Sequence, residues 1–254
     1  IDGNVVDLKG FSKFSIDRSY VTVKSKLSDY VSLAITSDMR DFTAENTSFK
    51  GYDIILKNAY ADWRLNFAPD LMTLRIGLQI SKYLELAEGT IWGRRYMEKS
   101  IGDLHGFLTS ADLGANLNFN IGDKGKWGNA GVALWNGSSY TNLNEKNANK
   151  DISIHGIFKP LINNPDFDKT VIGAQVYMGT QNVSFDTSAA EKASDRKNQV
   201  ISFGGKFNYK SYFDVSLDYW MNTLGQGPSP ATDLKQSALS FAVAVYTKPF
   251  VAET

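Results

Sequence analysis

The chain has 254 residues, with 27 basic and 27 acidic side chains, no Cys and 43% hydrophobic residues. A neutral balance argues against a dedicated nucleic-acid binder, which needs a basic face, and the lack of Cys excludes disulfides, thiolate zinc sites and cysteine nucleophiles. The length allows one large all-β domain or two ordinary domains. The longest apolar run, residues 241–246, is far too short for a membrane helix of about 20 residues.

Apolar and polar residues alternate along most of the chain. Met72, Leu74 and Ile76, for example, alternate with Thr73 and Arg75. This period of two indicates strands with one apolar and one polar face. Several of these strands are longer than the ~5–6 residues that are usual in soluble proteins. They reach the ~9–11 residues that a strand needs to cross a membrane. The end of a further strand is expected at residues 1–9. The eleven main strands are expected at residues 16–26, 30–40, 52–67, 71–83, 108–121, 129–136, 151–160, 170–179, 200–209, 212–222 and 236–247.

The connections between these strands alternate between short and long. The short or modest ones lie near residues 28–30, 68–70, 122–128, 161–169 and 209–212. The long, polar ones lie near residues 41–51, 84–107, 137–150, 180–199 and 223–235. Short turns at one end and long loops at the other are typical of outer-membrane β-barrels. The layout predicts an up-and-down antiparallel sheet whose two ends differ.

The alternation alone leaves open which face points inward. A soluble barrel has its apolar face inside, whereas a membrane barrel has it outside, toward lipid. The polar face carries charges of both signs, which suits a water-filled lumen and a soluble exterior equally. An interfacial girdle of aromatic residues beside the short turns favours the membrane barrel. The residues of this girdle are Trp63, Phe67, Phe119, Trp127, Tyr209, Tyr212 and Phe213.

Several segments, taken in order, resemble the bacterial outer-membrane porins related to the phosphate-selective porin group. They are residues 14–24, the run Trp92-Gly-Arg-Arg-Tyr-Met-Glu-Lys99, the strand opening Ser110-Ala-Asp-Leu-Gly114, and Trp135-Asn-Gly137 with the following strand as far as Pro160. The order of these segments carries the resemblance, because no single motif is specific. The resemblance implies a β-barrel channel with no cofactor and no chemical reaction.

The chain departs from that family at its ends. It finishes at Thr254 rather than on an aromatic residue, and it shows fewer strands. It also begins with Ile1 and has no leader pattern, so we expect either a removed signal peptide or a fragment. The expected fold is therefore one transmembrane β-barrel domain over residues 1–254, truncated at one or both ends. The ~12 strands recognisable in the sequence would form all or part of a barrel of ~12–16 strands. If the chain lacks strands of the intact barrel, the barrel would have ~14–16.

The segment at residues 84–106 combines length, charge and two aromatic residues, Trp92 and Tyr96. In many porins a long loop folds into the lumen and narrows it. We therefore predict a pore constriction formed by Arg94, Arg95, Glu98 and Lys99, with the two arginines attracting anions. An outward surface loop with solvated charges is the alternative, and the sequence leaves it open.

Charged residues on the polar face of the strands are the candidate pore wall. They are Arg18, Lys24, Arg40, Asp62, Arg64, Arg75, Asp112, Lys206, Asp214 and Asp218. Opposed strips of charge would orient a polar solute, whereas Arg and Asp paired across strands would merely satisfy one another. The two signs nearly cancel, so no preference for cations or anions is predicted. A phosphate preference would rest on the resemblance alone.

No enzymatic motif is recognisable. His105 and His155 lack the partners of an outer-membrane protease or phospholipase, and no zinc-protease, nucleophile-elbow or phosphate-loop pattern occurs.

The expected function is passive diffusion of small hydrophilic solutes or ions across the bacterial outer membrane, without metal or cofactor. The expected partners are outer-membrane lipid and lipopolysaccharide, with a homo-trimer by analogy to porins and no nucleic acid. The alternatives are a plugged or structural barrel acting through its outer loops, a soluble lipocalin-like carrier and an outer-membrane hydrolase.

Overall fold

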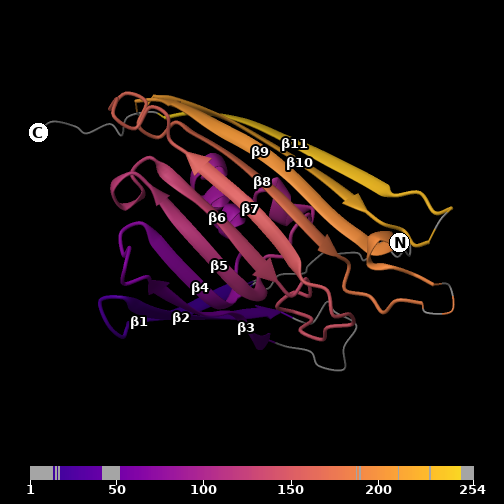
Figure 1. Cartoon of the computed structure of the whole chain (residues 1–254). Coiled ribbons are helices and arrows are strands. Elements are labelled where there is room, and N and C mark those ends of the chain that lie inside the picture. Colours follow the sequence, from indigo (N-terminus) through magenta and orange to yellow (C-terminus); the bar gives the residue numbers. More distant parts are fainter. Residues whose placement is uncertain are drawn as a thin grey trace, which may run out of the picture.

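The computed structural model describes residues 14, 16, 18–41, 52–186, 188, 190–210, 212–228 and 230–246. Eleven strands form one antiparallel sheet in which each strand pairs with its neighbours in sequence (Figure 1). The strands are β1 (Arg18–Lys26), β2 (Val31–Asp41), β3 (Tyr52–Arg64), β4 (Met72–Gln79), β5 (Asp112–Ile121), β6 (Gly128–Trp135), β7 (Asp151–Phe158), β8 (Val171–Thr180), β9 (Lys197–Tyr209), β10 (Phe213–Leu224) and β11 (Leu234–Val245). The predicted all-β antiparallel sheet is thereby confirmed. The further strand expected at residues 1–9 lies outside the described residues.

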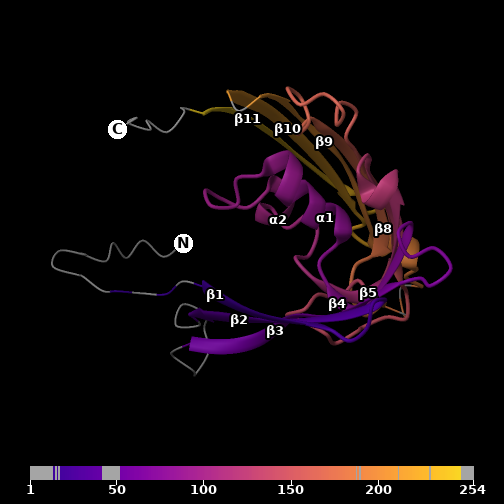
Figure 2. The same ribbon diagram turned by 90° about the vertical axis from the view of Figure 1, so that its left-hand side faces the viewer.

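The sheet curves across its width into an open C, with β1 to β3 facing β9 to β11 across a hollow (Figure 2). Each strand pair adds right-handed twist, so a sheet of this many strands curls. β1 and β11 are the two edges, and they do not pair with each other in the described part of the chain.

An insert between β4 and β5 occupies the hollow (Figure 2). We use this name for residues 82–108. The insert contains α1 (Lys82–Leu86), the π-helical segment η1 (Ala87–Trp92) and α2 (Ile101–Leu104). The remaining short helices are η2 (Asp123–Gly125), between β5 and β6, and η3 (Ala193–Arg196), before β9.

The predicted strands on either side of the insert were too long. β4 ends at Gln79, and β5 begins only at Asp112. The reason is a change of period, because Tyr83, Ala87 and Ile91 recur at helical spacing. All three are fully buried, so the helical face of the insert, not a strand, covers the sheet here.

The core lies between the insert and the concave face of β6 to β10. Phe107 stacks on Trp220 with ring centroids 6.2 Å apart, and the Tyr83 ring lies 5.9 Å from the same indole. Gly102 of α2 passes so close that an added Cβ would lie 2.4 Å from Trp220 Cζ2. The insert therefore packs closely against the concave face of β6 to β10.

The two faces of the sheet differ in polarity. On β10, Ser216 and Asp218 are buried on the concave side, while Leu217 between them is exposed. On β7, buried His155 follows exposed Ile154 in the same way. Large apolar side chains are exposed on the convex face: Val23, Ile35, Ile76, Leu134, Ile154, Ile172, Phe203, Leu217 and Phe241. The convex face is thus apolar, whereas the concave face carries buried polar side chains together with the apolar residues that pack on the insert.

β3 contains a bulge that reverses its alternation. The register between β2 and β3 shifts between Thr36 and Ser37, which leaves Lys57 as an extra residue. Before the bulge the exposed apolar residues of β3 are even-numbered, as at Ile54, and after it they are odd-numbered, as at Trp63. The bulge thus keeps both halves of the strand apolar on the convex side and directs Lys57 inward.

Candidate functional site: a groove between the insert and strands β1 to β4

The insert leaves the concave face of the first four strands partly open. Three recesses follow one another there. The first, of about 390 Å³, lies beside the β1–β2 turn, and the second, of about 480 Å³, lies beside Arg75 and Glu85. The third, of about 250 Å³, lies beside Lys57 and Arg95 at the end where the long loops are. Together we call these recesses the β1–β4 groove.

Arg75 is the centre of the second recess and is 8% exposed. Its Nε and Nη2 donate to the two carboxylate oxygens of Asp62 at 2.7 and 2.9 Å, and its Nη1 donates to Glu85 Oε2 at 3.2 Å. Lys82 Nζ donates to the same oxygen at 3.0 Å. Burial opposes the charge on Glu85, but Lys82 and Arg75 outweigh burial and hold the pKa of Glu85 below its ordinary value. Two cations and two carboxylates therefore neutralise one another here.

Arg94 lies against β10 and lines none of the three recesses. Its guanidinium is ion-paired with Asp214, and it donates to Ser216 Oγ at 3.0 Å and to the Trp92 carbonyl at 2.8 Å. Tyr246 donates a further hydrogen bond to Asp214. This geometry suits an anchor for the insert better than a donor to passing anions.

The other three residues of the predicted constriction lie apart from Arg94. Arg95 lines the third recess, with its Nε 3.6 Å from Glu88 Oε2. Lys99 Nζ lies 3.4 Å from Asp103 of α2, which lines the same recess. Glu98 is exposed, and its carboxylate accepts from the Lys99 backbone N–H. The structure thus brings Arg95 to the groove and Lys99 beside it.

Three pairs account for four of the predicted wall residues. Arg18 lies 3.1 Å from Asp38 on the neighbouring strand, Asp62 and Arg75 face each other across β3 and β4, and Asp214 holds Arg94. In these places the charges satisfy one another, as in the pairing alternative.

The remaining wall residues have varied surroundings. Asp112 and Asp218 are buried on the concave face, and Trp220 Nε1 donates to Asp218 at 2.9 Å. Lys24 and Arg64 are exposed and line the groove. Arg40, near the end of β2, and Lys206, on β9, are half-buried.

The sequence reasoning missed a cluster at the long-loop end of the groove. Lys57 Nζ lies 4.9 Å from the ring centroid of Tyr20 and 5.3 Å from that of Tyr140. The reversal of alternation within β3 was the signal that could have identified Lys57. No local pattern predicts Tyr140, because it reaches β3 from the loop after β6.

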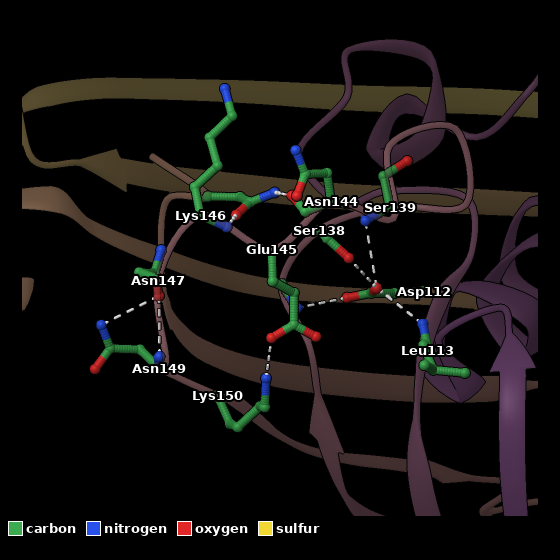
Figure 3. Close-up of polar contacts among 12 residues, drawn as sticks. Asp112, Leu113, Ser138, Ser139, Asn144, Glu145, Lys146, Asn147, Asn149 and Lys150 are labelled. Atoms are coloured by element: carbon green, nitrogen blue, oxygen red, sulfur yellow. Dashed lines mark hydrogen bonds and ion pairs between the residues drawn. The ribbon is translucent and has the colours of Figure 1, made fainter. Parts of the chain in front are cut away.

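Two long loops at the same end of the sheet are hydrogen-bonded to each other. Lys146 N donates to Asn182 Oδ1 at 2.8 Å, and Asn182 Nδ2 donates back to the Asn144 carbonyl at 2.9 Å (Figure 3). Asn147 Nδ2 donates to the Gln181 carbonyl at 3.0 Å. The Asn-rich composition of the loops thus serves side-chain to backbone bonding.

The two histidines lie in different surroundings. His155 is buried with its Nε2 3.4 Å from Asn129 Oδ1, and the His105 ring lies against Phe107 at a centroid distance of 6.3 Å. Within the described ranges, no three His, Asp or Glu side chains come together as metal ligands. No helix in those ranges has the length and hydropathy to cross a membrane.

Comparison of the chain with protein-family models, curated proteins and solved structures gave no match. The resemblance to porins therefore stays a prediction.

Proposed function

We propose that the chain forms the wall of an outer-membrane porin, a β-barrel through which small hydrophilic solutes or ions diffuse passively. The polarity of the two faces carries this proposal: polar side chains such as Asp218 are buried inside, and apolar ones such as Leu217 are exposed outside. A soluble sheet exposes its polar face to water. A membrane barrel instead has lipid outside and water inside.

The exposed apolar surface also favours a lipid partner. Leu239, Phe241 and Val243 of β11 are 63%, 65% and 55% exposed, and each Å² of apolar surface favours burial by about 25 cal/mol. Contiguous surface of this kind marks an interaction site. Outer-membrane lipid, including lipopolysaccharide, suits a face that continues over the whole sheet. The proposal includes a closed barrel, because hydrocarbon leaves no partner for the open edges of β1 and β11.

In this proposal the β1–β4 groove is the path of the solute. The strands form one wall, and the polar side of the insert forms the other. Because Arg75 and Lys82 neutralise Asp62 and Glu85, selection depends on cross-section and local dipoles more than on net charge. A preference for phosphate would be an argument by analogy.

The two ends of the sheet suggest its orientation. In bacterial outer-membrane barrels the short turns face the periplasm and the long loops face outward. Tyr209 lies 5.9 Å from Tyr212 and 6.0 Å from Phe213 between ring centroids, at a short turn. Such a group suits the membrane interface. A homo-trimer is proposed by analogy to porins alone.

A barrel plugged by its insert and acting through its outer loops is the second candidate. The apolar seating of the insert on β6 to β10 favours it, as do the hydrogen bonds that join residues 144–147 to residues 181–182. Such a barrel would share the lipid-facing surface but would not conduct.

Single-channel recording in a planar bilayer under a salt gradient separates the two candidates. Stable ohmic steps from the detergent-purified, heat-modifiable protein are expected for a porin, and the reversal potential would give its charge preference. If demonstrably folded protein gives no channel current, the porin is rejected and the plugged barrel is favoured.

A further inference from the structure

The loop after β6 sends Tyr140 back across the concave face to β2 and β3. β4 and β5 stand between β3 and β6 in the sheet, so this loop spans two strands. Tyr140 Oη donates to Asp38 Oδ2 at 3.3 Å, and the Tyr140 ring lies 5.3 Å from Lys57 Nζ. We call residues 137–143 the strap.

The base of the strap is fixed by Asp112. Its carboxylate accepts from Gly137 N at 2.7 Å, and from Ser138 Oγ and Ser139 N at 3.3 Å each (Figure 3). Ser139 has φ +128°, a conformation that non-glycine residues rarely adopt. Tyr140 N donates to the Ala111 carbonyl at 3.0 Å. These bonds hold a strained turn in place and direct the Tyr140 ring inward.

The far end of the strap is held by a network on β1 to β3. The bulge in β3 presents Lys57, which donates to Tyr20 Oη at 3.2 Å and contacts the rings of Tyr20 and Tyr140. Asp38, the acceptor of Tyr140, is fully buried and paired with Arg18. Burial and the charge of Asp38 raise the pKa of Tyr140 above its ordinary value, so its hydroxyl remains a donor at neutral pH.

This contact lies at the smallest of the three recesses. Tyr20 and Lys57 line that recess from the sheet, and Arg95 and Asp103 line it from the insert. At about 250 Å³, it is smaller than the ~300–1,000 Å³ clefts that hold drug-sized ligands. The Tyr140 ring thus contacts Lys57, which lines the smallest of the three recesses, from a third side.

We propose that the Tyr140 ring sets the size limit of the channel, so that ions and monosaccharides pass and oligosaccharides are held back. This inference rests on the proposed function. It differs from the constriction expected at residues 94–99, because the limiting side chain comes from the loop after β6 and not from the insert.

Tyr140→Ala tests the proposal, with Leu143→Ala as the matched control. Leu143 is 57% exposed in the same strap. Single-channel conductance and swelling of liposomes in glucose and raffinose are measured on protein whose heat-modifiable mobility shows that it is folded. Tyr140→Ala is expected to raise conductance roughly twofold, because pore radius sets flux, and to admit raffinose. Leu143→Ala should match the unaltered chain.

Two further variants keep the test decisive. Tyr140→Phe retains the ring and is expected to keep the size limit, so admission of raffinose by this variant would overturn the proposal. Asp112→Asn weakens the base of the strap, and it is expected to raise the limit even if Tyr140→Ala does not fold. Conductance from the unaltered chain with no change in Tyr140→Ala would overturn the inference alone, whereas a silent unaltered chain would overturn the proposed function.

Discussion

Arg94 of the insert and Asp214 of β10 form an ion pair in which both side chains are buried, with 7% and 9% of their side-chain surface exposed. The two residues are 120 positions apart in sequence. Because Asp214 lies on the opposite side of the hollow from the β1–β4 groove, the pair fastens the insert to the sheet and leaves the groove free.

Replacing Arg94 by Ala should therefore loosen the insert. Removing one partner of a buried ion pair costs about 3–5 kcal/mol, so we expect a lower unfolding midpoint and a noisier, larger current. Arg95→Ala is the control, because the Arg95 side chain is exposed, its contact with Glu88 is long at 3.6 Å, and ion pairs of exposed side chains contribute little stability. Arg95→Ala should shift the reversal potential instead. Unchanged stability in Arg94→Ala would contradict the anchoring role.

The sequence predicted the sheet well and offered cross-strand pairing of Arg and Asp as an alternative, but it did not predict the ion pair between the insert and β10. Alternation reports which face each side chain takes, so the strand positions and the polarity of both faces were readable, down to residues such as Ile76 and Arg75. The pairing of Arg94 with Asp214 depends on how the insert folds back over distant strands. No spacing along the chain encodes that contact, and the same is true of Tyr140 and Asp38.

The sequence predicts only part of the structure of the insert. Its charge and aromatic content indicate a folded loop, yet the sequence pattern predicts a strand end at Tyr83 and an irregular loop at Ala87 and Ile91. The helical period was present, but it covers only about two turns and borders a clear strand pattern. Short apolar runs of this kind are ambiguous between helix and strand.

Gly102→Ala should disturb the seating of the insert. An added Cβ would lie 2.4 Å from the Trp220 ring, and overpacking of this kind costs about 1–3 kcal/mol. Gly89→Ala is the matched control, since its Cβ would meet nothing within 4 Å. Thermal unfolding followed by heat-modifiable mobility should show a lower midpoint for Gly102→Ala only. Equal midpoints would show that α2 does not pack as described.

The Glu85 bridge should be insensitive to pH near neutrality. Lys82 and Arg75 lower the pKa of Glu85 relative to the unfolded chain. Its contribution to stability is therefore complete above the ordinary glutamate pKa of about 4.3 and is lost as pH falls through the lower folded value. We expect the Glu85 bridge to contribute no change in conductance from pH 7 to 5. Glu85→Gln should make the groove more positive and shift the reversal potential toward anions at pH 7.

Adjacent residues on β11 offer a test of the lipid-facing surface. Phe241 is exposed on the convex face, and Ser240 is half-buried on the concave face. An arginine facing lipid costs about 2–4 kcal/mol at the bilayer midplane, so Phe241→Arg should lower the denaturant midpoint in liposomes. Ser240→Arg should have a much smaller effect. The opposite ranking would mean that the faces are assigned the wrong way round.

The most direct measurement of the central claim uses the neighbouring residues Val23 and Lys24 of β1. The chain contains no Cys, so Val23→Cys and Lys24→Cys each carry one reactive thiol. Val23 is 65% exposed on the convex face, and Lys24 lines the groove. During single-channel recording, a charged, membrane-impermeant thiol reagent should reduce the current through Lys24→Cys and leave Val23→Cys unchanged. Modification of Val23→Cys with block of the current, and none at Lys24→Cys, would contradict a channel whose polar face is inside.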